Sequence, residues 1–100
     1  MFRVTASYHH PADADAFLAH YRAVHDPLTR TMPGLAAFEW GVCETPDGSR
    51  PPYFVVAVLT FPDRETALTS LGSTEGQAGA ADMANFAMAG VEVTMWEAQG

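Results

Sequence analysis

The feature that most constrains the fold is the run Tyr53–Phe61, which is apolar at nearly every position. Its valines and aromatic residues, bounded by turn-forming residues on both sides, are typical of a β-strand. Because successive side chains on a strand point to opposite faces, this strand presents apolar groups on both sides of its sheet. The run therefore predicts a sheet that is covered on both faces, with helices able to cover only one of them.

Hydrophobic periodicity predicts the other elements of the fold. Phe2–Tyr8 alternates apolar and polar side chains, which is typical of a strand with one buried face. A helix follows from about Ala14 to about Thr31, and Asp13 or Asp15 can cap it. A second strand covers Leu35–Cys43, and Tyr53–Phe61 is the third. A short helix follows from Asp63 to about Leu71, and a second helical piece begins with a capping box at Thr74–Gln77 and reaches about Ala87. The last strand covers Val91–Trp96. The order β-α-β-β-α-β predicts an α+β, ferredoxin-like fold with one antiparallel four-stranded sheet.

In this arrangement both helical regions lie on one face of the sheet and leave the other face bare. Tyr53–Phe61 is apolar on that side too, and Phe38, Trp40 and Trp96 add apolar bulk to the other strands. A bare apolar face of this kind is an interaction site rather than a solvent-exposed surface. The simplest cover is a second copy of the same sheet, so the sequence predicts a homodimer whose sheets face each other.

The charge pattern excludes several classes of partner. Acidic residues outnumber arginines by 12 to 5, there is no lysine, and the formal net charge is -7. Without a basic stripe for phosphates, the sequence predicts no nucleic-acid binding, and an anionic membrane surface would repel the chain. The longest apolar run is too short to span a bilayer, and the first residues do not resemble a signal peptide, which favours a cytoplasmic protein with no membrane attachment. Cys43 is the only cysteine, so an internal disulfide is excluded.

The strongest candidate for chemistry is a pair of side chains on the first helix. Tyr21 and His25 stand one turn apart on an otherwise apolar face, and Pro27 follows two residues later. A histidine titrates near neutral pH, and this face points into the protein. Pro27 cannot donate to the carbonyl of Ala23, so we expect a kink or a restart of the helix there, and that carbonyl is a structural partner for His25. The pair is therefore either the working part of a pocket or a packed histidine beside a core tyrosine.

The ordered set of motifs resembles the EthD-domain family. Tyr21-x-x-x-His25-x-Pro27-Leu28 and Pro33-Gly34-Leu35 are similar to the first helix and turn of that family. Pro52-Tyr53-Phe54 with Val55-Val56-Ala57 is similar to its third strand, and Ser73–Gln77 through Ala80–Phe86 to its late helix. The resemblance covers nearly the whole chain and implies the dimeric α+β barrel superfamily, in agreement with the predicted dimer. It also implies an association with bacterial degradation of ethyl tert-butyl ether, beside an oxygenase system.

The resemblance implies a pocket between the sheet and the helices, with His25 facing into it. His25 is then the expected general acid or base, and Tyr21 is expected to hydrogen-bond an oxygen of the substrate. Four further residues are expected to bind substrate in the same pocket: Tyr8 and His9 at the end of the first strand, and Asp82 and Asn85 on one face of the late helix. Each of these residues also has an ordinary structural interpretation.

We expect neither a metal nor a cofactor. Adjacent histidines such as His9 and His10 on an extended chain point to opposite faces, so they do not form a natural pair of ligands. The sequence has no Gly-rich phosphate loop, no nucleotide-binding fingerprint and no nucleophile elbow.

Three functions remain open at this stage. The first is cofactor-free proton transfer on a small apolar, oxygen-bearing molecule, in an isomerisation, dehydration or decarboxylation that uses His25 and Tyr21. The second is a non-catalytic accessory that binds such a molecule for a partner oxygenase, with the acidic surface docking a redox partner. The third is a structural dimer whose pocket is filled by side chains.

Overall fold

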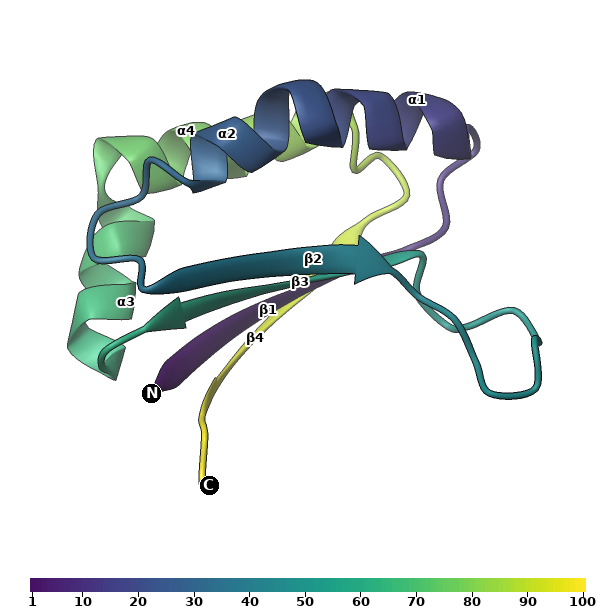
Figure 1. Cartoon of the computed structure of the whole chain (residues 1–100). Helices are drawn as coiled ribbons and strands as arrows, with labels where there is room; N and C mark the ends of the chain where they lie inside the picture. Colours follow the sequence, from purple (N-terminus) through teal and green to yellow (C-terminus); the bar gives the residue numbers. More distant parts are fainter.

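The computed structural model describes residues 1–100, and its helices α1, α2 and α4 lie over one face of a sheet while α3 stands at one end of it (Figure 1). The strands are β1 (Phe2–Tyr8), β2 (Ala37–Val42), β3 (Val55–Phe61) and β4 (Val91–Glu97). The helices are α1 (Ala14–His20), a π-helical turn (Tyr21–His25), α2 (Asp26–Thr29), α3 (Arg64–Gly72), α4 (Thr74–Asp82) and a 3-10 turn (Met83–Asn85). The predicted α+β, ferredoxin-like order is confirmed. No helix has both the length and the apolar character needed to cross a membrane.

The sheet is antiparallel throughout, and its strand order β2-β3-β1-β4 places β1 and β3 in the centre. Val4 of β1 pairs with Leu59 of β3 on one side and with Met95 of β4 on the other. Every second residue of β1, in phase with Val4, is buried, because these side chains face the helices. The hydrophobic core therefore lies between the sheet and the helical layer.

The strand register decides which side chains occupy the bare face of the sheet. Phe38 and Trp40 pair with buried positions of β3, so both lie on the helix side. Of the three large side chains named above for apolar bulk, only Trp96 lies on the bare face, where Arg3 packs over its ring. The expectation that Phe38 and Trp40 add apolar bulk to this face is wrong, and the alternation places polar residues there as well. They include Thr5, Ser7, Glu39 and Thr94.

The first helical segment runs without a break from Ala14 to Thr29. The Asp13 side chain caps it by accepting the N–H of Ala16 at 3.0 Å. Before Pro27 the chain adopts a π turn, in which the N–H of Asp26 donates to the carbonyl of Tyr21, five residues back. The backbone stays helical through this turn, so the helix does not restart at Asp26, and the irregularity before Pro27 is a widened turn.

The two later helices are capped by side chains at their N-termini. Asp63 caps α3 as predicted, accepting the N–H of Thr66 at 2.8 Å. Ser73, rather than Thr74, caps α4, because Ser73 is the residue with extended backbone between the two helices and its Oγ accepts the N–H of Gly76. The cap is therefore displaced by one residue, and the predicted capping box does not form, because Gly76, three residues after Ser73, has no side chain that could bond back to the cap. The α-helix also ends at Asp82 rather than near Ala87, and continues only as a 3-10 turn.

The turn from α2 into β2 depends on Gly34, whose φ of 76° is left-handed. A Cβ at this position would also collide with Cγ2 of Thr66, whereas a Cβ at Gly48, with a φ of 78°, would meet nothing within 4 Å. We expect Gly34→Ala to lower the free energy of unfolding by more than about 2 kcal/mol and Gly48→Ala by about 1 kcal/mol, because only the former adds a collision to the backbone cost. Urea denaturation measures both values.

A second substitution separates the collision from the backbone strain. Thr66→Ser removes the colliding methyl group and keeps the hydroxyl, so it should restore part of the stability lost in Gly34→Ala. Equal losses in Gly34→Ala and Gly48→Ala, with no recovery in the double variant, would contradict this account of the turn.

Candidate functional site

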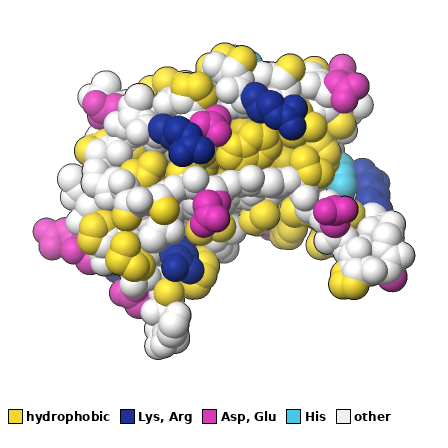
Figure 2. Space-filling model, viewed as in Figure 1, with side chains coloured by type: hydrophobic (Ala, Val, Ile, Leu, Met, Phe, Trp, Pro, Cys, Tyr) yellow, Lys and Arg dark blue, Asp and Glu magenta, His cyan; other side chains and the backbone are white.

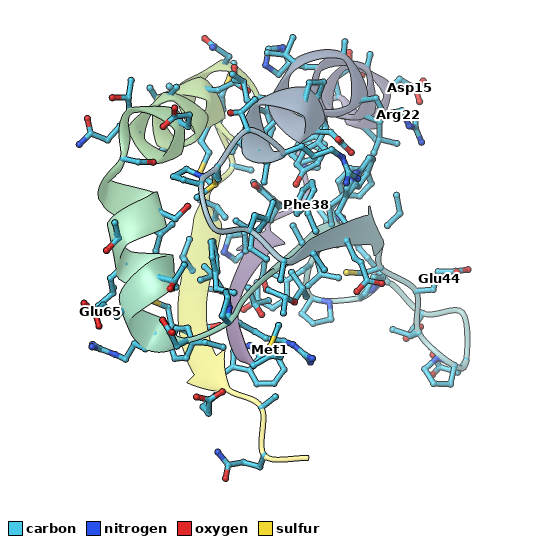
Figure 3. All side chains as sticks on the ribbon, turned by 60° about the vertical axis from the view of Figure 1, so that its left-hand side comes forward. Met1, Asp15, Arg22, Phe38, Glu44 and Glu65 are labelled. Atoms are coloured by element: carbon cyan, nitrogen blue, oxygen red, sulfur yellow. The ribbon has the colours of Figure 1, made fainter.

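A cavity of about 180 Å³ lies between the sheet and the helices. Val4 and Ala57 of the central strands line its floor, and α4 lines the opposite wall. Phe38 of β2 borders one side, and Figure 3 shows this side chain projecting into the space between the two layers. Val93 of β4 also lines the cavity although it is half exposed, so the cavity reaches solvent beside this edge strand. An apolar cavity of about 150 Å³ holds a single aromatic ring, so this volume suits a ligand of about that size.

Polar side chains converge at one end of the cavity. Tyr8 and Tyr21 meet edge to face with ring centroids 5.7 Å apart, and Tyr8 Oη lies 3.5 Å from Nε2 of His25, which is long for a hydrogen bond. The hydroxyl of Thr29 donates to the backbone carbonyl of His25 at 3.0 Å. Tyr21 is fully buried, and its hydroxyl interacts with that of Tyr8 but forms no hydrogen bond of normal geometry in the chain. A buried hydroxyl without such a bond costs about 1–3 kcal/mol, so Tyr21 offers a donor to an acceptor that comes from outside.

A buried carboxylate holds His25 in place from behind. Nδ1 of His25 donates to Oδ2 of Asp82 at 3.0 Å, which leaves Nε2 directed to the cavity. Nε2 of His20 donates to the same carboxylate at 2.9 and 3.1 Å, and the amide of Asn85 donates to it at 3.0 Å. His25 and Asp82 are both nearly inaccessible to solvent, whereas the His20 side chain is 28% exposed. The carboxylate therefore links a buried histidine on the cavity to a histidine at the surface.

The π turn makes this sharing possible. Residues five apart on an α-helix lie roughly 140° from each other around the axis, so His20 and His25 would not face the same group. The wider turn between them brings both side chains to Asp82. The carbonyl of Ala23, named above as a structural partner, does not bind the His25 side chain, whose partner is Asp82 instead.

Burial sets the protonation states at this end of the cavity. It lowers the pKa of His25, and the hydrogen bond to Asp82 offsets only part of this effect, so the imidazole is neutral at cellular pH. Burial raises the pKa of Tyr8 to about 12 and that of Tyr21 further, so both hydroxyls remain protonated donors. Burial alone would raise the pKa of Asp82, but the hydrogen bonds that it accepts lower it overall. The carboxylate is therefore ionised beside a neutral imidazole whose Nε2 can accept a proton.

Aromatic rings hold these groups in position. Phe86 packs 4.7 Å from the His25 ring and 5.4 Å from the His20 ring, centroid to centroid. Trp40 packs 4.4 Å from the Tyr21 ring and donates its Nε1–H to Asp26 at 2.8 Å. Figure 2 shows apolar side chains gathered along the seam between the helical layer and β2. The side chains around the polar end are thus fixed by packing from both sides.

The structure brings together most of the residues proposed from the sequence. Tyr8, Tyr21 and His25 line the cavity, and Asp82 lies directly behind His25. Asn85 contacts Asp82 but does not line this cavity. The structure places His9 outside the cavity, partly exposed and paired with Glu92, because it follows the last residue of β1 and points to the opposite face from Tyr8. Sequence reasoning missed His20 and Thr29.

The missed residues left little signal in the sequence. His20 lies off the α-helical face of His25, and only the π turn brings it to the same carboxylate. Pro27 was the one sign of an irregular helix, but a proline does not reveal that the turn before it is widened. Thr29 lies one turn after His25, so its position on the cavity was accessible from spacing alone.

A family model and a solved structure name the same family. The EthD domain model matches residues 9–90. An uncharacterized 11.0 kDa protein in the thcB-thcC intergenic region of Rhodococcus erythropolis is 44% identical over 91 residues, which cover 91% of this chain and 88% of that protein. The crystal structure of an ethyl tert-butyl ether degradation (EthD) family protein from Bacillus halodurans C-125 superposes with a TM-score of 0.92 at 28% identity, over 99% of each chain. A dimeric ferredoxin-like protein of unknown function from Thermobifida fusca YX shares the fold, with a TM-score of 0.74 at 11% identity over 97% of this chain and 90% of that one.

Two substitutions should move the pKa of His25 in opposite directions. Asp82→Asn removes the negative charge that favours the imidazolium, so the pKa of His25 should fall further below its ordinary value. His20→Gln removes the electrostatic interaction with His20 that lowers the pKa of His25, so this pKa should rise. An NMR titration of the His25 ring protons measures both shifts, and Asn85→Ala, which keeps both charges, should shift the pKa less than either.

The change of folding stability with pH is a second test of these pKa shifts, and its direction follows from them. Because the folded pKa of His25 lies below its unfolded value near 6.5, the unfolded chain binds this proton more tightly, and the His25 contribution to stability is lost as the pH falls below about 6.5. The contribution of Asp82, whose pKa is lowered, is lost only at pH below about 4.

If Asp82→Asn and His20→Gln shifted the His25 pKa in the same direction in the NMR titration, the shared-carboxylate account would be wrong.

Proposed function

The chain belongs to the EthD family, and from its cavity we propose that it acts on a small, apolar, oxygen-bearing molecule by cofactor-free acid–base chemistry. The apolar body of the substrate fills the space between sheet and helices, and its oxygen lies at the polar end. The observation that carries this proposal is the buried Tyr21 hydroxyl, which forms no hydrogen bond of normal geometry, on the same cavity as the neutral His25, whose ring centroid lies 5.0 Å from that of Tyr21. Isomerisation, dehydration and decarboxylation of a carbonyl compound are the reactions that suit these groups.

The first step is the removal of a proton from the carbon next to the carbonyl. Nε2 of His25 takes the proton, the C–H electron pair forms a carbon–carbon double bond, and the carbonyl electrons move onto oxygen. Tyr21 donates a hydrogen bond to that oxygen as its negative charge develops, and Asp82 stabilises the imidazolium through Nδ1–H. Return of the proton to another carbon completes an isomerisation, and its transfer from His25 to a β-hydroxyl, which leaves as water, completes a dehydration. In a decarboxylation, the C–C electron pair freed by loss of CO2 takes the place of the C–H pair, and the carbon then takes up a proton from solvent.

The same cavity also suits a non-catalytic accessory role. In that case Tyr8 and Tyr21 hold the oxygen of a bound intermediate, and His25 serves only as a further polar contact. The net charge of -7 supports docking of a basic redox or oxygenase partner, which would weaken with added salt. This alternative and the catalytic one share the ligand and differ in turnover.

We also propose that two copies associate through the bare faces of their sheets. Val56 and Val58 of β3 lie on that face, and Trp96 of β4, which is 42% exposed, borders the same shallow hollow from across β1. The helices leave this side of the sheet uncovered (Figure 1). The ferredoxin-like protein from Thermobifida fusca, which is described as dimeric, supports a dimer here.

The catalytic proposal is tested by exchange of the α-protons of cyclohexanone in D2O, followed by NMR. We expect the wild-type protein to accelerate exchange, His25→Ala to slow the catalysed rate at least about 100-fold, and Tyr21→Phe to slow it about tenfold or more. Tyr21→Phe should be no less stable than the parent in thermal unfolding, because it removes a buried hydroxyl that forms no hydrogen bond of normal geometry.

Tyr53→Phe is the matched control, since the Tyr53 hydroxyl donates to Glu92 outside the cavity. Its exchange rate should equal that of the parent. Binding of cyclohexanone without any acceleration of exchange would favour the accessory role, and an absence of both would refute the proposed ligand class.

The dimer is tested by light scattering after size-exclusion chromatography. Val58→Asp places a charge in the middle of the bare face, so it should convert the dimer to a monomer. Val24→Asp makes the same chemical change at a position 38% exposed on the first helical segment and should leave the dimer intact. A monomeric wild-type protein at micromolar concentration would overturn the proposed assembly.

A further inference from the structure

Helix α4 contains two glycines, Gly76 and Gly79, although glycine is one of the least favourable residues inside a helix. Gly76 has a steric reason: a Cβ there would collide with the carbonyl oxygen of Ser70 and lie 2.6 Å from that of Leu71. Gly79 has no such reason, since a Cβ at this position would meet no atom within 4 Å and its φ is not left-handed. The backbone of α4 therefore tolerates any small side chain at position 79.

The open space beside Gly79 is the cavity. Gly79 is buried and lines the cavity, so the empty volume that a Cβ would enter is internal and not bulk solvent. On α4 and the 3-10 turn that continues it, the cavity-facing positions are Gly76, Gly79, Ala80 and Met83, which follow the i, i+3, i+4, i+7 spacing of one helix face. Asp82 lies three residues after Gly79, so this space adjoins the end that holds His25.

We propose that Gly79 is a specificity-determining residue, which admits a six-membered-ring ketone with a small substituent by leaving out a side chain. The inference rests on the ligand-binding function proposed above. The fully buried Tyr21 hydroxyl, which forms no hydrogen bond of normal geometry, supports it independently because it lies at the end of the same space. A methyl group occupies about 30 Å³, close to one water molecule's share of liquid volume, and would remove roughly a sixth of the 180 Å³ cavity.

The test is the single substitution Gly79→Ala, measured with cyclohexanone and with 4-ethylcyclohexanone as probes. Alanine favours the helix and fills an empty space, so the melting temperature should rise by about 4 °C or more. The affinity for 4-ethylcyclohexanone should fall about tenfold or more relative to that for cyclohexanone, because one methylene in an apolar pocket has this effect on binding. Stability and binding of the larger probe should therefore change in opposite directions.

Gly72→Ala is the matched control. Gly72 is exposed at the end of α3, has no left-handed φ, and a Cβ there would also meet nothing within 4 Å. This variant should bind both probes as the parent does. If the wild-type protein binds the probes and Gly79→Ala binds both equally well, the role of Gly79 is refuted while the proposed function stands. If the wild-type protein binds neither probe, the proposed function and this inference fail together.

Discussion

The buried carboxylate of Asp82 is the group on which the arrangement of the cavity depends. An ionised carboxylate away from water is costly unless it is hydrogen-bonded, and here His20, His25 and Asn85 all donate to it. These bonds join α4 to the first helical segment, which lies about sixty residues earlier in the chain. They hold the two parts of the helical layer together above the sheet, and they leave Nε2 of His25 directed to the cavity.

Departures from regular structure gather around this cavity. The first helical segment widens into a π turn, Tyr21 buries a hydroxyl without a hydrogen bond of normal geometry, and α4 places Gly79 where the backbone does not require glycine. None of these departures favours folding. Each one either makes room in the cavity or provides a polar group there. This pattern is typical of a chain that gives up some stability to keep a binding site open.

Much of the fold follows from local patterns in the sequence. The period of two in Phe2–Tyr8, the double-sided apolar run of β3 and the caps at Asp13 and Asp63 predict the element order directly. The face on which Phe38 and Trp40 lie was not predictable in the same way, because a shift of one residue in strand register reverses every side chain. At the site, helix spacing identified Tyr21 with His25. The sharing of Asp82 with His20 was not predictable, since it depends on the π turn and on a contact across 62 residues.

The central claim is that Asp82 fixes His25 as a neutral imidazole with the lone pair of Nε2 toward Tyr8 and the cavity. The most direct test is the tautomeric state of His25 in the unliganded protein at pH 7.5, read from its two ring 15N chemical shifts by NMR. The account predicts a protonated Nδ1 and an unprotonated Nε2. A proton on Nε2, or an imidazolium that persists at this pH, would contradict it.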